Sequence, residues 1–286
     1  MLSLGLAGIA AALVAAGPPG LASARTTRTA GPALGTAARA GRLASLYWIF
    51  YKEDVERINK FDPEIVQEMT SGPGTYALTR SPAGLKLPPG VIKVENFFSE
   101  ASLEQAIGDK TVFTGVRVVA EDPEDWRATP MDERQLPIRY MKAFSAAADS
   151  HGYQPILVPA RDLMRVKGAV CTQKPSQTIS QAYIACGMPA AAARARMFVI
   201  QAAAVETNLP ALRQLVQQGA ADALRANPDV IVLATLSAAP DGSPVPTSAL
   251  IAAAKTILPY VKGLELNSEP ANDHELVTFL TELNGS

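Results

Sequence analysis

A repeating alternation of short apolar runs and helix-like stretches does most to limit what this chain can fold into. Seven apolar runs are separated by loops and, in most cases, by stretches with helical periodicity. Short buried strands that alternate with helices predict a parallel sheet. The runs are Tyr76–Arg80, Ile92–Phe97, Val116–Glu121, Pro155–Pro159, Met197–Gln201, Val230–Thr235 and Gly263–Asn267.

Helices are predicted in most of the gaps between these strands and at the end of the chain. They are Leu103–Ile107, Asp132–Gly152, Leu209–Asn227, Ser248–Val261 and Asp273–Leu283. The stretch Leu43–Met69 also carries apolar residues at helical spacing. Asp62 and Pro63 divide it into two helices, with Asp62 as the N-cap and Pro63 at the first helical position. An eighth strand would lie either in the irregular segment 161–190 or near the N-terminus.

The faces of the strands favour a closed barrel over an open doubly wound sheet. Side chains alternate strictly along a strand, and three of the runs have one apolar face and one charged or polar face. An open sheet covered by helices should be apolar on both faces. We therefore predict an α/β fold, a (β/α)8-like TIM barrel with seven clear strands, and expect the polar faces to point inward. These faces hold Arg117, Val119 and Glu121, then Lys93 and Glu95, and finally Glu265 and Asn267.

The first 24 residues predict a secretory signal peptide. They contain no Lys, Arg, Asp or Glu, and the apolar run Leu2–Ala16 is shorter than the ~20 residues that span a bilayer. Helix-breaking Pro and Gly follow, and then the small residues Ala22-Ser23-Ala24 of a cleavage site. An uncleaved membrane anchor is the alternative. We expect cleavage after Ala24, a flexible tether over residues 25–42 and a single barrel domain over residues 43–286.

This leader predicts a secreted, extracellular protein, and no later segment is apolar enough to predict a membrane span in the mature chain. The two cysteines, Cys171 and Cys186, therefore indicate a disulfide, as an isolated pair in an exported protein usually does. Such a loop contributes roughly 3 kcal/mol in the chain-entropy description. A metal site is the alternative, but neither His151 nor His274 lies near the pair.

Charge and motifs exclude several classes of function. The net charge of −1 gives no basic surface for nucleic acid. The G-x-G-x-x-G, P-loop, H-E-x-x-H and G-x-S-x-G patterns do not occur in the sequence. No cofactor and no metal are therefore expected, and the oligomeric state stays open.

Carboxylates and amides at the predicted strand ends indicate glycoside hydrolysis, which uses a pair of carboxyl groups. Glu121 is the first candidate for a catalytic acid, because it ends an alternating strand and opens a loop rich in acids. Glu265 and Glu95 are the other catalytic candidates. The candidate substrate-binding residues are Asp122, Trp126, Gln201, Glu206, Asn267 and Arg80, with Trp126 as a platform for a sugar ring.

Two other interpretations stay open. In the first, the barrel is not catalytic and binds a glycan or another cell-envelope polymer through the same residues. In the second, Lys93, Glu95, Arg117 and Glu121 form a structural ion network inside the barrel, and the function lies on an outer loop or in oligomerisation.

Three segments resemble motifs of uncharacterised secreted bacterial proteins that look like glycoside-hydrolase-type TIM barrels. They are Val118–Trp126 with the following Thr129-Pro130 and Asp132-Glu133-Arg134, then Phe198–Ala202, and then Gly263–Asn267. The resemblance covers roughly residues 75–283. It implies a glycoside-hydrolase-type TIM barrel in a secreted protein.

Overall fold

Eight parallel strands close into a barrel in the computed structural model, which describes residues 41–81, 86–268 and 273–286. Each strand pairs in parallel with the next one in the sequence, and β8 pairs with β1 to close the ring. The predicted TIM barrel is therefore confirmed. The strands are β1 Tyr47–Tyr51, β2 Gly74–Thr79, β3 Val91–Phe97, β4 Val118–Glu121, β5 Gln154–Leu157, β6 Met197–Ile200, β7 Ile231–Ser237 and β8 Gly263–Asn267.

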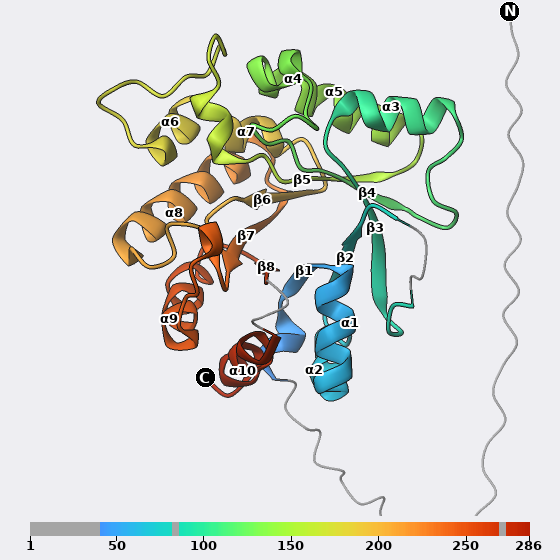
Figure 1. Cartoon of the computed structure of the whole chain (residues 1–286), viewed down its shortest axis with the longest axis vertical. Helices are drawn as coiled ribbons and strands as arrows, with labels where there is room; N and C mark the ends of the chain where they lie inside the picture. The colour runs from blue at the N-terminus through green and yellow to red at the C-terminus, as the bar shows by residue number, and fades with distance from the viewer. Residues whose placement is uncertain (1–40, 82–85, 269–272) are drawn as a thin grey trace, which may run out of the picture. The chain divides into compact units, whose positions relative to one another are not determined.

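Helices follow the strands and surround the barrel, as Figure 1 shows. They are α1 Lys52–Phe61, α2 Pro63–Thr70, α3 Glu100–Gly108, α4 Met131–Gln135, α5 Pro137–Ser150, α6 Ile179–Ala185, α7 Met188–Ala192, α8 Leu209–Ala226, α9 Thr247–Ile257 and α10 Asp273–Asn284, with short 3₁₀ helices at Arg42–Ser45, Arg161–Arg165 and Pro240–Gly242. The predicted helix over Asp132–Gly152 is two helices, because Pro137 begins α5. Among the described residues, no helix is long and apolar enough to cross a membrane.

The eighth strand lies near the N-terminus, where helix was predicted from Leu43 onward. That prediction is wrong for β1, Tyr47–Tyr51, which is a continuous run of aromatic and aliphatic residues without a helical period. Such residues favour strands. The prediction for Asp62 is confirmed: its side chain accepts hydrogen bonds from the backbone N–H groups of Glu64 and Ile65 at the start of α2.

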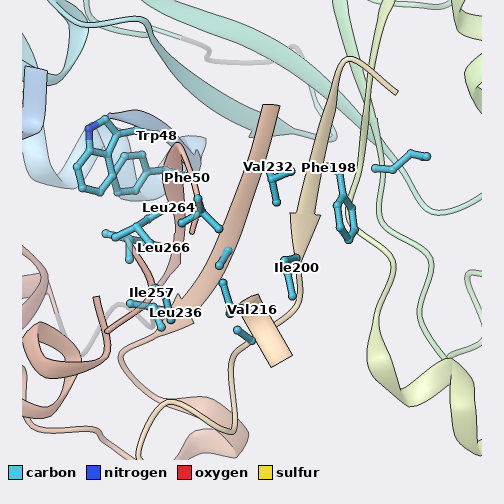
Figure 2. Close-up of a cluster of buried hydrophobic side chains, with 14 of the residues drawn as sticks. Trp48, Phe50, Phe198, Ile200, Val216, Val232, Leu236, Ile257, Leu264 and Leu266 are labelled. Atoms are coloured by element: carbon cyan, nitrogen blue, oxygen red, sulfur yellow. The ribbon is translucent and has the colours of Figure 1, made fainter. Parts of the chain in front are cut away.

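Two apolar layers hold the barrel. Inside it, side chains such as Ile49, Val118 and Leu233 form one buried cluster. Outside it, strand residues such as Phe198 and Leu264 pack against the helices in a larger cluster. Figure 2 shows part of this outer cluster, with Trp48, Phe50, Ile200, Val232, Leu236 and Leu266 from the strands and Val216 and Ile257 from α8 and α9.

The longest connection between consecutive strands, residues 158–196, runs from β5 to β6 and is called the β5–β6 excursion below. It holds the 3₁₀ helix Arg161–Arg165, α6 and α7. The predicted disulfide between Cys171 and Cys186 is confirmed and lies entirely within this excursion, with 5.6 Å between the two Cα atoms. The predicted signal peptide, and the predicted tether except Gly41 and Arg42, lie outside the described residues.

Candidate active site

The C-terminal ends of the strands meet at one end of the barrel, where TIM-barrel enzymes place their active sites. Tyr51 ends β1, and Asp122 directly follows β4. The hydroxyl group of Tyr51 donates a hydrogen bond to Oδ2 of Asp122 at 3.4 Å. Nη2 of Arg80, just beyond β2, lies 4.0 Å from the same oxygen. Side chains that are distant in the sequence thus converge on one carboxyl group at the mouth of the barrel.

The environment of Asp122 favours the protonated acid. The pKa of its carboxyl group is about 7, against an ordinary value of 3.8. Burial is the largest cause, and the charge of Glu265 acts in the same direction. Arg80 and hydrogen bonds with Asn96 and Tyr51 act in the opposite direction. Asp122 therefore exchanges its proton near neutral pH, as a general acid or base must.

Glu265 is the second buried acid at the mouth. It lies in β8 with 2% of its surface exposed, and the Thr235 hydroxyl of β7 donates a hydrogen bond to its carboxyl group. Burial raises the pKa of Glu265 to about 7; the bond from Thr235 lowers it and the charge of Glu124 raises it. Glu124 also has a pKa of about 7, chiefly through burial and then through the charges of Asp122 and Asp162.

Tyr51 is the site residue that the sequence analysis missed. Burial raises the pKa of its hydroxyl group, and the charges of Asp122 and Glu265 raise it further. Tyr51 therefore stays a neutral hydrogen-bond donor to Asp122. Its position as the last residue of an aromatic run, directly before the polar start of α1, is the one signal in the sequence that marks it as a strand end.

A cavity of about 830 Å³ opens beside Tyr51 and is bounded by the loops that follow β4 to β8. Its polar lining includes Glu124, Arg161, Gln201 and Asn267. The cavity is large enough for a small-molecule or sugar ligand, because such sites commonly measure about 300–1,000 Å³. Gln201 and Asn267 are thus at the mouth, as predicted.

The wall of this cavity is held by Arg161. Its guanidinium group donates one hydrogen bond to the Ser180 hydroxyl at 2.9 Å and another to the backbone carbonyl of Ala203. The next residue, Ala204, has a φ of 66°, in the left-handed region that disfavours side chains with a Cβ. Glu206 was predicted to bind substrate; it is 1% exposed and, like Asp122 and Glu265, is not among the residues that line the cavity.

The predicted inward orientation of Glu121 is wrong. Its neighbours Val118 and Ala120 fill the barrel interior, whereas Val119 packs in the outer cluster. Because side chains alternate along β4, Glu121 points outward with Val119. It is fully buried, and burial followed by the charges of Glu133 and Glu100 raises its pKa well above the ordinary value. Glu121 is therefore a buried acid beneath the helices, away from the mouth, and its surroundings favour the protonated form.

Glu95 has the same reversed orientation, since Val94 of β3 fills the interior. Its carboxyl group accepts a hydrogen bond from the backbone N–H of Phe113 at 2.8 Å. Arg117 is exposed, and in the described part of the chain no ion pair joins it or Lys93 to Glu95 or Glu121. The polar residues that point to the mouth are instead the next ones along the chain. Asn96 follows Glu95 in β3, and Asp122 follows Glu121 directly after β4.

Trp126 and Arg80 belong to one stacked group beside the mouth. The Arg80 guanidinium carbon lies 3.6 Å from the ring centroid of Phe98 and 5.5 Å from that of Trp126. Trp126 packs edge-on against Phe98 and donates a hydrogen bond from Nε1 to Thr129. Trp126 does not line the large cavity. Among the described residues, no group of three or more His, Cys, Asp or Glu is placed to hold a metal ion.

Comparisons with known proteins leave the reaction open. No protein-family model matches the sequence, and no curated protein matches it. Among solved structures, the chain is similar to the X-ray crystal structure of the YdjI aldolase from Escherichia coli K12. The identity is 11%, the TM-score is 0.36, and the similarity covers 84% of this chain and 88% of that one. A similarity of this size carries no argument about function.

Proposed function

We propose that this protein hydrolyses a glycosidic bond with Asp122 and Glu265 as its two carboxyl groups. The observation that carries the proposal is that both are buried at the mouth with a pKa of about 7, and that the charge of Glu265 raises the pKa of Asp122. Two acids in one another's field divide into a protonated one and an ionised one. Glycoside hydrolysis needs that division.

The hydrogen bonds favour one assignment of roles. Ionised Glu265 is stabilised by the hydroxyl of Thr235, and its charge keeps the proton on Asp122. Asp122 then protonates the glycosidic oxygen as its bond to the anomeric carbon breaks. Glu265 either attacks that carbon or removes a proton from the water that does so, and the anomeric form of the product tells the two apart.

The surroundings of the pair suit a carbohydrate. Gln201 and Asn267 offer amide groups to sugar hydroxyls in the 830 Å³ cavity, and Tyr51, which also lines it, donates a hydrogen bond to Asp122. The disulfide of the β5–β6 excursion, which supplies part of the cavity lining, agrees with the predicted secretion, since disulfides persist in oxidising compartments.

A polysaccharide panel with two isosteric variants tests this proposal. We expect Asp122→Asn and Glu265→Gln each to lower the rate by about 10²–10⁴-fold, the usual effect of removing a general acid or base. The control is Glu282→Gln, an exposed acid in α10, which should leave the rate unchanged. Full activity in both variants would contradict the assignment. Glycan binding without turnover by the wild type would instead favour the non-catalytic binding barrel.

A further inference from the structure

Contacts with aromatic rings hold the Arg80 side chain in place. Its guanidinium carbon lies over the ring of Phe98, and the ring of Trp126 lies farther from it. Its ion pair with Asp122 is at 4.0 Å, beyond hydrogen-bonding distance. Within the described ranges, no group accepts a hydrogen bond from Arg80, and 43% of its side chain is exposed. The aromatic contacts therefore hold the guanidinium group in place while its N–H groups stay available to a ligand.

Arg80 lines a second, smaller recess. This recess has a volume of about 160 Å³ and is lined by Tyr51, Glu53, Leu78, Thr79, Arg80 and Asn96. That volume corresponds to roughly five water molecules at ~30 Å³ each. It admits a substituent and part of a sugar ring but not a longer chain. Tyr51 also lines the 830 Å³ cavity, so it borders both spaces, and its hydroxyl group contacts Asp122.

We propose that Arg80 binds the carboxylate of an acidic sugar residue, so that the substrate of this barrel is a glycan containing uronic acid. A guanidinium group offers two parallel N–H groups that match a carboxylate, and stacking on an aromatic ring preorganises it. The inference rests on the proposed function and deepens it. It places the acidic residue in the small recess and the rest of the glycan in the large cavity, with Tyr51, the hydrogen-bond donor to Asp122, bordering both.

The acids around Arg80 make this binding depend on pH. The charge of Arg80 acts on Asp122 and Glu124 after β4, and Arg80 shares the recess with Tyr51 of β1 and Glu53 of α1; the charge of Glu265 in β8 raises the pKa of Asp122. Arg80 lowers the pKa of both Asp122 and Glu124, each of which is about 7. Below that pH the two acids are neutral and Arg80 is free for a ligand anion. Above it they compete for Arg80 and repel the anion.

Free monosaccharides test the proposal without any hydrolysis, because they contain no glycosidic bond. We would titrate the full chain with glucuronate, galacturonate and mannuronate, and with glucose, galactose and mannose as neutral counterparts, and follow binding by ligand-observed NMR. At pH 5.5 at least one uronate should bind about tenfold more tightly than its neutral counterpart. The preference should fall about tenfold by pH 8.5, and Asp122→Asn should reduce that fall.

Variants at Arg80 identify the group responsible. Arg80→Gln should weaken uronate binding about tenfold, as expected for a lost charge-assisted hydrogen bond at a partly exposed site, and Arg80→Lys should restore only part of it because lysine lacks the planar fork. The control is Arg225→Gln, an exposed arginine of α8 that pairs with Asp222, and it should bind as the wild type does. Equal binding of acidic and neutral sugars, or no binding of either, overturns the inference.

The outcome is separable from that of the proposed function. Uronate binding that depends on Arg80, in a protein that cleaves no polysaccharide, would support the anion site and contradict the proposed hydrolysis. Hydrolysis of a neutral glycan, with no effect of Arg80→Gln on binding, would support the proposed hydrolysis and contradict the anion site.

Discussion

Replacing Glu265 with glutamine should stabilise the protein at high pH and leave its stability almost unchanged at low pH. The carboxyl group of Glu265 is buried and has a pKa of about 7, against an ordinary 4.5. Between these values the unfolded chain has released the proton and the folded chain still holds it, so wild-type stability falls as the pH rises. Each pKa unit corresponds to 1.36 kcal/mol, which gives a loss of about 3 kcal/mol by pH 9. Glutamine cannot ionise and avoids this loss.

Glutamine should fit in the place of Glu265. Its side-chain oxygen can accept the hydrogen bond that the Thr235 hydroxyl donates to Glu265. Removing the charge of Glu265 also removes one cause of the raised pKa of Asp122, which adds to the stabilisation at high pH. Glu265→Gln should therefore exceed the wild type by about 3 kcal/mol in free energy of unfolding at pH 9 and by only a few tenths at pH 4.

Urea unfolding of both proteins at intervals from pH 4 to pH 9, with the disulfide intact, measures this difference. Glu282→Gln, an exposed change in α10, should follow the wild type at every pH. If Glu265→Gln were destabilised by the same amount at pH 4 and pH 9, the ionised carboxylate would be a structural partner and the reasoning would fail. A gain in stability together with a loss of activity would indicate that Glu265 serves the activity although it lowers the free energy of unfolding.

Four further outcomes follow from features of the chain. Reducing the Cys171–Cys186 bond should lower the free energy of unfolding by about 3 kcal/mol, measured by urea denaturation with and without reductant. Glu121→Gln should keep the rate on any glycan substrate within about twofold, because Glu121 faces the helices; a loss like that of Asp122→Asn would return it to the site. Ala204→Gly should raise stability by about 1 kcal/mol, since φ is 66° there, and thermal denaturation checks this. N-terminal sequencing of exported protein should find cleavage after Ala24.

The architecture follows from the sequence because it depends on a repeated local pattern. Seven of the eight strands lie where short apolar runs occur, and alternation with helices restricts them to a parallel sheet. The missing strand, Tyr47–Tyr51, has apolar residues at every position. A run of this kind shows neither the helix period nor the strand period, so its neighbours in the barrel decide its structure.

The site was predicted only in part, because alternation divides a strand into two faces without saying which one is inside. For β8 the polar face with Glu265 does point to the mouth. For β4 it does not, and Asp122 takes the place expected of Glu121. Two successive polar residues occur near the end of β3, Glu95-Asn96, and at the end of β4, Glu121-Asp122, and one of each pair must face inward whichever way the strand is turned. The contact between Tyr51 and Asp122 joins residues 71 positions apart and leaves no local signal.

The β5–β6 excursion has a consequence for how this barrel can change. It supplies Arg161, Asp162 and Arg165 to the large cavity, and its covalent cross-link closes only on itself. The acids proposed to react, by contrast, stand on β8 and directly after β4. A change confined to residues 158–196 would therefore alter the lining of the large cavity and leave the reacting groups and the strand register as they are, as long as α7 keeps its packing against α5 and α8.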